Sequence, residues 1–361
     1  MERNKNIEAM RGIAMLGMLI YHYSISISGF KLGYEMQMLR ELLGQISLIS
    51  FFVLSGFGTY MYFFREEENG KKFTVGNYVK KRLKKLLPPY YICIGILIVF
   101  TSKVVYLNSS QLFQVLESVF LVQNFDPYNT LNGVTWTIAT LAQLYFFAGF
   151  FYKWIRKKGL AVYPFVVVGC ILIKMLMARG IIVGGLDSIW LVVIGIRLPF
   201  TICDLYLAGM CSAYLYLKWR ESIGKYQIVV WRCFGTLLTC VVVWGLYLWI
   251  TKIGIYGDNV GNCVFQSLVG LIISVFVFWF ANEKFTYQSI IGKGIQCVAR
   301  NEYGIFLWHM IIMGNLVGFP TDWWIYLNEN NPSILLILTC VVSIGVGLVF
   351  MRMVNKPYKN T

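Results

Sequence analysis

The sequence predicts an all-α, polytopic membrane protein with about ten transmembrane helices and both termini in the cytoplasm. The 361-residue chain is 58% hydrophobic, and its mean hydropathy of +0.63 lies above the range usual for soluble domains. Apolar stretches long enough to cross a bilayer recur along the whole length. Cationic residues gather in alternate loops between these stretches, as they do in the cytoplasmic loops of membrane proteins.

Ten apolar stretches are long enough to span the membrane. We expect them near 8–28, 44–64, 87–106, 136–155, 161–179, 197–217, 228–250, 263–282, 301–319 and 333–353. Because they take up most of the chain, we expect one integral-membrane domain over 1–361 and no separate soluble domain. The first residues include acidic side chains and no small-residue cleavage site, which favours a retained first span over a cleaved signal peptide.

The loops between the expected spans alternate in charge. The loop at 65–86 carries eight cations, whereas the loops at 107–135 and 320–332 carry none. This alternation holds through ten spans and places both termini on the cytoplasmic side of a plasma membrane, which we expect to be bacterial. It also accounts for the net charge of +15 without a nucleic-acid partner. The nine cysteines show no CxxC pair and no Cys/His cluster, so we expect neither a disulfide framework nor a metal site.

The two histidines of the chain, His22 and His309, both fall in expected spans. Ionisable side chains at bilayer depth are costly and mark functional sites by default. Arg11 lies eleven residues before His22, so the two share roughly one helix face, about 16 Å apart. Histidine titrates near neutrality and suits a general base for a hydroxyl. The alternative is a snorkelling Arg11 with structural histidines; two histidines on separate helices could also meet at one cavity.

Two further stretches carry charge close to expected spans. VKKRLKKLLPPYY (79–91) places five cations in six positions. This pattern is typical of an anchor that contacts anionic lipid, and it would also suit a cytoplasmic site for a phosphate-bearing cofactor. Arg197 and Asp204 are seven residues apart in the sixth span, which predicts a buried ion pair or a polar cavity lining.

Two smaller features have ordinary structural explanations. Ser55 and Gly56, among the aromatic residues of the second span, predict a close approach of two helices. Trp136 opens the fourth span after a cation-free loop and is typical of an aromatic-belt residue.

Four stretches together resemble the acyltransferase-3 family of ten-span membrane acyltransferases. RGIAMLGMLIYH is similar to that family's Arg–ten residues–His motif, and FFVLSGF to its second-span signature. KKRLKKLLPPYY is similar to its basic stretch ending in Pro and Tyr, and YGIFLWH to its late Trp-His segment. The matches follow the family order. The stretch TWTIATLAQLYFF departs from the Trp and Ser-x-Glu of many relatives, because it has Thr140 and Gln143 and no carboxylate. In this it resembles the branch that acts on polysaccharides.

The resemblance implies transfer of an acyl group, often acetyl, from cytoplasmic acyl-CoA to a hydroxyl of a cell-surface or lipid-linked glycan. It implies Arg11 and His22 as the essential pair, with His22 as the base or acyl-relay residue. We further expect His309 to be catalytic and no metal to take part. Arg82, Lys84 and Lys85, together with Arg11, would bind the phosphates of the acetyl-CoA or other acyl-CoA donor. We expect a substrate cavity formed by Tyr21, Ser55, Trp136, Arg197, Asp204, Tyr303 and Trp308.

Two other functions fit parts of the pattern. Ten spans with intramembrane His, Arg and Asp also suit a proton-coupled exporter or flippase of a glycan intermediate. The sequence shows no relation between two halves, which counts against a transporter with inverted repeats. A sensor or assembly protein without turnover is the third possibility. In every case we expect membrane lipid around the chain and no nucleic acid.

Overall fold

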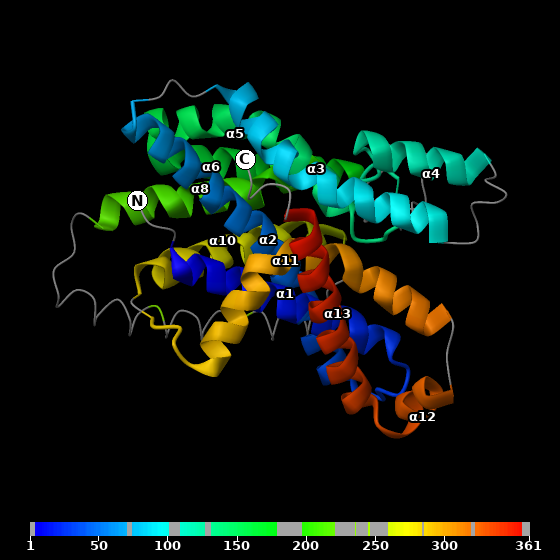
Figure 1. Ribbon diagram of the computed structural model, residues 1–361. Coiled ribbons are helices and arrows are strands. Elements are labelled where there is room, and N and C mark those ends of the chain that lie inside the picture. The colour runs from blue at the N-terminus through cyan, green and yellow to red at the C-terminus, as the bar shows by residue number, and fades with distance from the viewer. Residues whose placement is uncertain are drawn as a thin grey trace.

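The computed structural model describes residues 4–70, 74–100, 109–126, 131–178, 197–220, 235, 245, 259–283, 285–318 and 322–355. Within these ranges the chain forms helices and no strand, so the expected all-α fold is confirmed. The main helices are α1 (Lys5–Ser26), α2 (Tyr34–Glu68), α3 (Val75–Phe100), α4 (Ser109–Phe120), α5 (Trp136–Lys158), α6 (Val162–Ala178), α8 (Pro199–Arg220), α10 (Asn259–Asn282), α11 (Ile290–Gly318), α12 (Asp322–Asn330) and α13 (Pro332–Asn355). Most of the long ones run side by side (Figure 1).

Five helical stretches of the described chain are long and apolar enough to cross a membrane. They are Tyr34–Glu68, Trp136–Met177, Pro199–Trp219, Val264–Asn282 and Pro332–Val354. Large apolar side chains on such helices face outward; Phe165 is 73% exposed and Val341 is 62% exposed. Exposed apolar side chains of this size are expected where lipid surrounds the helix. The chain is therefore a multi-pass membrane protein. The expected span at 228–250 lies outside the described residues, apart from two glycines.

Several helices extend beyond the apolar stretches that reveal them. α2 begins at Tyr34 rather than near 44, α3 at Val75 rather than near 87, and α11 at Ile290 rather than near 301. Hydropathy marks only the part of a helix that lies in the bilayer, so it assigns the charged turns outside the bilayer to loops. The short helices α4 and α12 lie within the stretches 107–135 and 320–332, where no helix was expected.

The described residues form two apolar clusters in the interior. One cluster is built mainly from α2, α5, α8 and α10, and the other mainly from α1, α3, α11 and α13. In the first, α2 and α8 approach closely at two glycines. A Cβ atom on Gly56 would lie 1.9 Å from the Tyr206 carbonyl oxygen, and one on Gly209 would lie 1.8 Å from the Val53 carbonyl oxygen. The close approach predicted from Ser55 and Gly56 is therefore confirmed.

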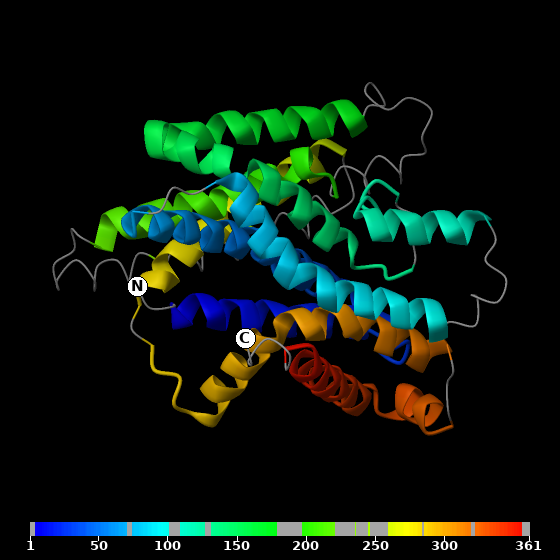
Figure 2. The ribbon, with the colours of Figure 1, turned by 45° about the horizontal axis from the view of Figure 1, so that its top comes forward.

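The beginning of α1 is fixed to the end of α10. The Asn4 side chain accepts hydrogen bonds from the first turn of α1, which stabilises the helix start. The Asn6 amide donates to the carbonyl oxygens of Phe280 and Glu283, at 2.8 and 2.7 Å. In Figure 2 the beginning of α1 and the ends of α2 and α8 lie toward the same side of the bundle. This arrangement agrees with the alternation of charge, which assigns that side to the cytoplasm.

Candidate active site

The packing of α1 against α11 brings the two histidines together. The ring centroids of His22 and His309 are 5.2 Å apart, although the residues are far apart in the sequence. His309 is fully buried and His22 is half-buried. Two imidazoles inside a membrane protein, close enough to interact through their ring nitrogens or one small group, form an arrangement suited to moving a proton.

One ring nitrogen of His309 has its role fixed by the backbone. Nδ1 lies 2.7 Å from the Phe306 carbonyl oxygen, and because a carbonyl can only accept, Nδ1 carries the proton. Nε2 therefore presents a lone pair, and it is buried with no hydrogen-bond partner within the described chain. The Tyr23 hydroxyl donates to the His309 carbonyl oxygen at 3.1 Å and also bonds Ser343, which fixes this turn of α11.

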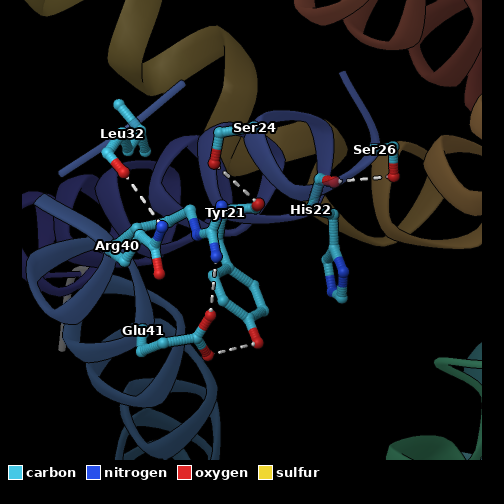
Figure 3. Close-up of polar contacts among 8 residues, drawn as sticks. Tyr21, His22, Ser24, Ser26, Leu32, Arg40 and Glu41 are labelled. Atoms are coloured by element: carbon cyan, nitrogen blue, oxygen red, sulfur yellow. Dashed lines mark hydrogen bonds and ion pairs between the residues drawn. The ribbon is translucent and has the colours of Figure 1, made fainter. Parts of the chain in front are cut away.

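Tyr21 lies beside His22 and is held by α2. The two rings are 5.0 Å apart, and the Tyr21 hydroxyl donates to Glu41 Oε2 at 3.1 Å. Arg40 contacts the other oxygen of that carboxylate at 3.2 Å. Figure 3 shows both rings extending from α1, with the Tyr21 hydroxyl turned toward Glu41. The Tyr21 ring covers Gly44, where a Cβ atom would come within 2.6 Å of it. Tyr21 thus flanks the histidine pair at the α1–α2 contact.

A cavity of about 270 Å³ lies between the two apolar clusters. Helices α1, α2, α3, α5, α11 and α13 contribute to its wall. Its charged and polar lining comprises Glu8, Arg11, Ser55, Arg82, Lys85, Thr137, Tyr145, Arg300, Glu302 and Tyr303. Phe306 also lines it, and the Phe306 ring is 5.7 Å from the His309 ring. The cavity therefore approaches the histidine pair through Phe306, and neither histidine is part of its lining.

Arg11 is held inside this cavity by two contacts. Its Nη1 lies 3.3 Å from Glu302 Oε1, and its Nη2 donates to the Leu54 carbonyl oxygen at 3.3 Å. Both side chains of the ion pair keep 23% of their surface exposed. A guanidinium fixed at two points, with part of its surface open to the cavity, is prepared to bind an anion.

The basic stretch of α3 divides between two faces of the helix. Arg82 and Lys85 line the cavity, whereas Lys80 and Lys84 line an apolar groove beside Phe146. Residues two apart on a helix point about 200° from each other, so Lys84 cannot share a site with Arg82. Of the four cations expected to bind phosphate, Arg11, Arg82 and Lys85 therefore share the cavity, whereas Lys84 lies apart from it.

The Arg82 guanidinium is supported by a chain of hydroxyl groups. It lies over the Tyr78 ring, 5.2 Å from the centroid. The Tyr78 hydroxyl is 2.6 Å from Thr59 Oγ1, which in turn accepts from the Tyr206 hydroxyl at 2.6 Å. This network joins α3, α2 and α8, so the position of Arg82 depends on three helices.

The expected pairing of Arg197 with Asp204 is wrong. α8 begins at Pro199, a residue favoured at helix starts, so Arg197 precedes the helix and the spacing of seven does not place the two on one face. The Arg197 guanidinium lies 5.4 Å from the centroid of the Trp136 ring. Asp204 is fully buried, and neither carboxylate oxygen has a hydrogen-bond partner within the described residues. None of these three residues lines the cavity near the histidines.

The remaining candidates divide in the same way. Ser55 and Tyr303 line the cavity, and the Tyr303 hydroxyl donates to the Leu86 carbonyl oxygen at 2.8 Å. Trp308 packs on Phe350 instead, with the ring centroids 5.3 Å apart. Thr140 donates to the carbonyl oxygens of Trp136 and Arg197, a structural role.

The sequence prediction lacks several cavity residues, of which Arg300 and Glu302 are the most important. Both lie within three residues before the YGIFLWH stretch. The apolar pattern starts after Arg300 and so assigns it to a loop, although α11 begins ten residues earlier. Charged residues one turn before an intramembrane motif were the available signal. Tyr145 and Glu8 had no comparable signal in the sequence.

Comparison with known proteins identifies a family. A family model described as an acyltransferase domain, that of the acyltransferase-3 family, matches residues 4–352. No curated protein and no solved structure matches the chain. The match includes α1 with Arg11 and His22, the basic face of α3, and α11 with His309. The chain therefore belongs to the acyltransferase-3 family of membrane acyltransferases.

Proposed function

We propose that the protein transfers an acyl group, most simply acetyl, from cytoplasmic acyl-CoA to a hydroxyl of a cell-surface or lipid-linked glycan. The observation that carries this proposal is the meeting of His22 and His309 just beyond the inner wall of a cavity rich in cations. Transfer from acyl-CoA requires a base beside the thioester, near the middle of the membrane, and an anion site for the phosphates on one side of that base.

The charge of the cavity favours a phosphate-bearing donor. Four cations and two carboxylates line it, and one of those carboxylates already pairs with Arg11. Arginine and lysine bind phosphate through charge-assisted hydrogen bonds, which are about twice as strong as neutral ones. Arg82 and Lys85 reach the cavity from α3 and Arg300 from α11, so an anion between them would be bound from two sides.

The transfer step uses the two imidazoles. His22 accepts the proton of the acceptor hydroxyl as that oxygen attacks the thioester carbonyl carbon. The new C–O bond forms, the C–S bond breaks, and the departing CoA thiolate takes the proton from His22. The Nε2 lone pair of His309 is available to stabilise the imidazolium formed on His22. General-base assistance of this kind supplies about 10²–10⁴ in rate, so positioning of the thioester must supply much of the rest.

The test is transfer of label from radiolabelled acetyl-CoA to glycan in membranes that contain the protein. We expect His22→Ala to lower transfer by about 10²–10⁴-fold and Arg11→Ala to lower it mainly through weaker donor binding. Lys157→Gln, on an exposed cation at the end of α5, is the control. Near-native transfer by His22→Ala would refute the role of this histidine.

The exporter alternative is separated by a second measurement. The purified protein, without any ion gradient, should exchange or slowly hydrolyse labelled acetyl-CoA, which a glycan exporter would not do. Mass spectrometry of surface glycans from a strain lacking the protein would then identify the acceptor by the substituent that disappears. Loss of whole glycan chains, with every substituent intact on those that remain, would favour export.

A further inference from the structure

A second basic hollow adjoins the cavity at the end of the bundle where α1 begins. It has a volume of about 390 Å³. Its lining consists of Lys5, Tyr287, Lys293, Gln296, Cys297, Arg300, Asn301, Leu348 and Arg352. Arg300 lines both spaces. Four cations from α1, α11 and α13 thus surround this hollow, and no carboxylate is part of its wall.

The cations of the hollow are not neutralised by neighbours in the part of the chain that the structure describes. The ion pairs found there involve Arg11, Arg40 and Arg156, and none of the four cations of the hollow. α11 also begins beside the hollow, and its first turn contains no acidic side chain. The positive end of the helix dipole therefore adds to the attraction for an anion.

The wall of the hollow is built by specific hydrogen bonds. The Gln296 amide donates to the Lys5 carbonyl oxygen at 2.9 Å and joins α11 to α1. The Tyr287 hydroxyl donates to Asn6 Oδ1 at 2.9 Å, and the Asn6 amide binds the end of α10. Tyr287 is thus fixed at its hydroxyl end and is one of the residues that line the hollow.

This combination of groups fits a phosphorylated nucleoside. Lysine and arginine bind phosphate, an aromatic ring provides a surface on which a base can stack, and the Asn301 side chain adds polar atoms. We propose that the hollow binds the phosphorylated nucleoside end of acyl-CoA, while the first cavity takes the pyrophosphate and the pantetheine arm. This inference rests on the proposed function.

The geometry of α11 agrees with one donor molecule occupying both spaces. Lys293 and His309 are sixteen residues apart on this helix, or about 24 Å along its axis. Arg300 lies between them and belongs to both spaces. The first cavity, at about 270 Å³, is smaller than the usual range for sites that enclose a whole small molecule, about 300–1,000 Å³. The hollow would provide the additional volume for the phosphorylated nucleoside end of the donor.

The experiment measures binding of non-acylated CoA and of dephospho-CoA, which lacks the 3′-phosphate, to the full-length protein by titration calorimetry. We expect the native chain to bind CoA about tenfold more tightly than dephospho-CoA. The double variant Lys293→Gln/Arg352→Gln should weaken CoA binding about tenfold and remove most of this preference. The matched control Lys157→Gln/Lys158→Gln removes two exposed cations from α5 and should behave like the native chain.

A second measurement uses a native residue as the reporter. Cys297 is exposed and lines the hollow, so a bound donor should slow its alkylation by a maleimide. The ligands are the S-methyl thioethers of CoA and of dephospho-CoA, because a free thiol would consume the maleimide. Protection should be weaker with the dephospho ligand and should largely disappear in Lys293→Gln/Arg352→Gln. This readout does not depend on turnover, and the His22→Ala variant should show the same protection as the native chain.

The outcomes separate this inference from the proposed function. If the native chain binds CoA and transfers acyl groups, yet the double variant and Cys297 are unaffected, the hollow is not the nucleoside site and the transfer proposal stands. If the native chain neither binds CoA nor transfers acyl groups, both proposals fail. If the native chain in detergent binds a short-chain anionic phospholipid, and the double variant loses that binding but keeps its CoA binding, the cations serve a lipid headgroup and the inference is overturned.

Discussion

At the scale of single residues, the ring nitrogens of His309 decide what the histidine pair can do. The bond from Nδ1 to the Phe306 carbonyl oxygen fixes the tautomer and the orientation of the ring. An unsatisfied buried acceptor such as Nε2 costs about 1–3 kcal/mol, and proteins retain such groups where another molecule uses them. The adjacent His22 is the natural partner within the chain, and in the proposed reaction an acceptor hydroxyl is the second.

The role of Nε2 can be separated from the role of Nδ1 by substitution. In His309→Asn the side-chain amide can still donate to the Phe306 carbonyl oxygen, but no group replaces Nε2. We expect the variant to fold, with a Tm in detergent close to that of the native protein. Its kcat should be lower by about 10²–10⁴-fold. A variant with near-native kcat would show that His309 serves only to pack α11.

At the scale of elements, α3 offers an internal control for the donor site. Its cations point to opposite faces, with Arg82 and Lys85 in the cavity and Lys80 and Lys84 outside it. Replacing the first pair by glutamine should raise the KM for acyl-CoA about tenfold or more, because each cation would contribute a charge-assisted bond to phosphate. Replacing the second pair removes the same charge and should change the KM by no more than about twofold.

The two α3 pairs also distinguish a specific site from a general field. If net positive charge near the membrane surface were what attracts the donor, both double variants would raise the KM equally, and both effects would shrink in high salt. Equal effects would therefore contradict the assignment of Arg82 and Lys85 to the donor.

The contact between α2 and α8 depends on glycine. Any side chain at Gly56 would meet the Tyr206 carbonyl oxygen, so Gly56→Ala forces the helices apart. This change should lower the free energy of unfolding by about 1–3 kcal/mol. The separation would also disturb the hydroxyl network that joins Tyr206 to Arg82. The measurements are Tm in detergent and KM for acyl-CoA, both of which should worsen. Gly95→Ala on α3 has open space around it and should leave both unchanged.

At the scale of the whole molecule, the sequence predicts the class of fold but only a few of the contacts between helices. Hydropathy and the alternation of charge identify the helices because both depend on local composition and on the bilayer. The meeting of His22 with His309 depends on the packing of α1 against α11, which no local pattern contains. The position of both histidines in expected spans identified the residues of the pair, but neither their separation nor the tautomer of His309.

The errors in the site prediction come from misplaced helix starts. The prediction groups Lys84 with Arg82 and assigns Arg300 to a loop, because hydropathy does not mark the charged turns outside the bilayer as helical. Once α3 and α11 are extended, the direction of each side chain follows from about 100° per residue. The predicted pairing of Arg197 errs in the opposite direction, because it places Arg197 on a helix that begins only at Pro199.

The orientation of the whole molecule determines whether the proposed donor can reach its site. Acyl-CoA is cytoplasmic, so the cavity and the basic hollow must open on the side where α1 begins.

Lys31, in the segment between α1 and α2, should lie outside the cell, and Asn69, just after α2, should lie inside. Both residues are exposed and can be replaced by cysteine. A membrane-impermeant maleimide should label Lys31→Cys in intact cells and should label Asn69→Cys only after permeabilisation. The native chain corrects for background, and its exposed Cys297 should behave like Asn69→Cys. The reverse pattern would place the cations of both spaces outside the cell, away from any acyl-CoA, and would contradict the proposed donor.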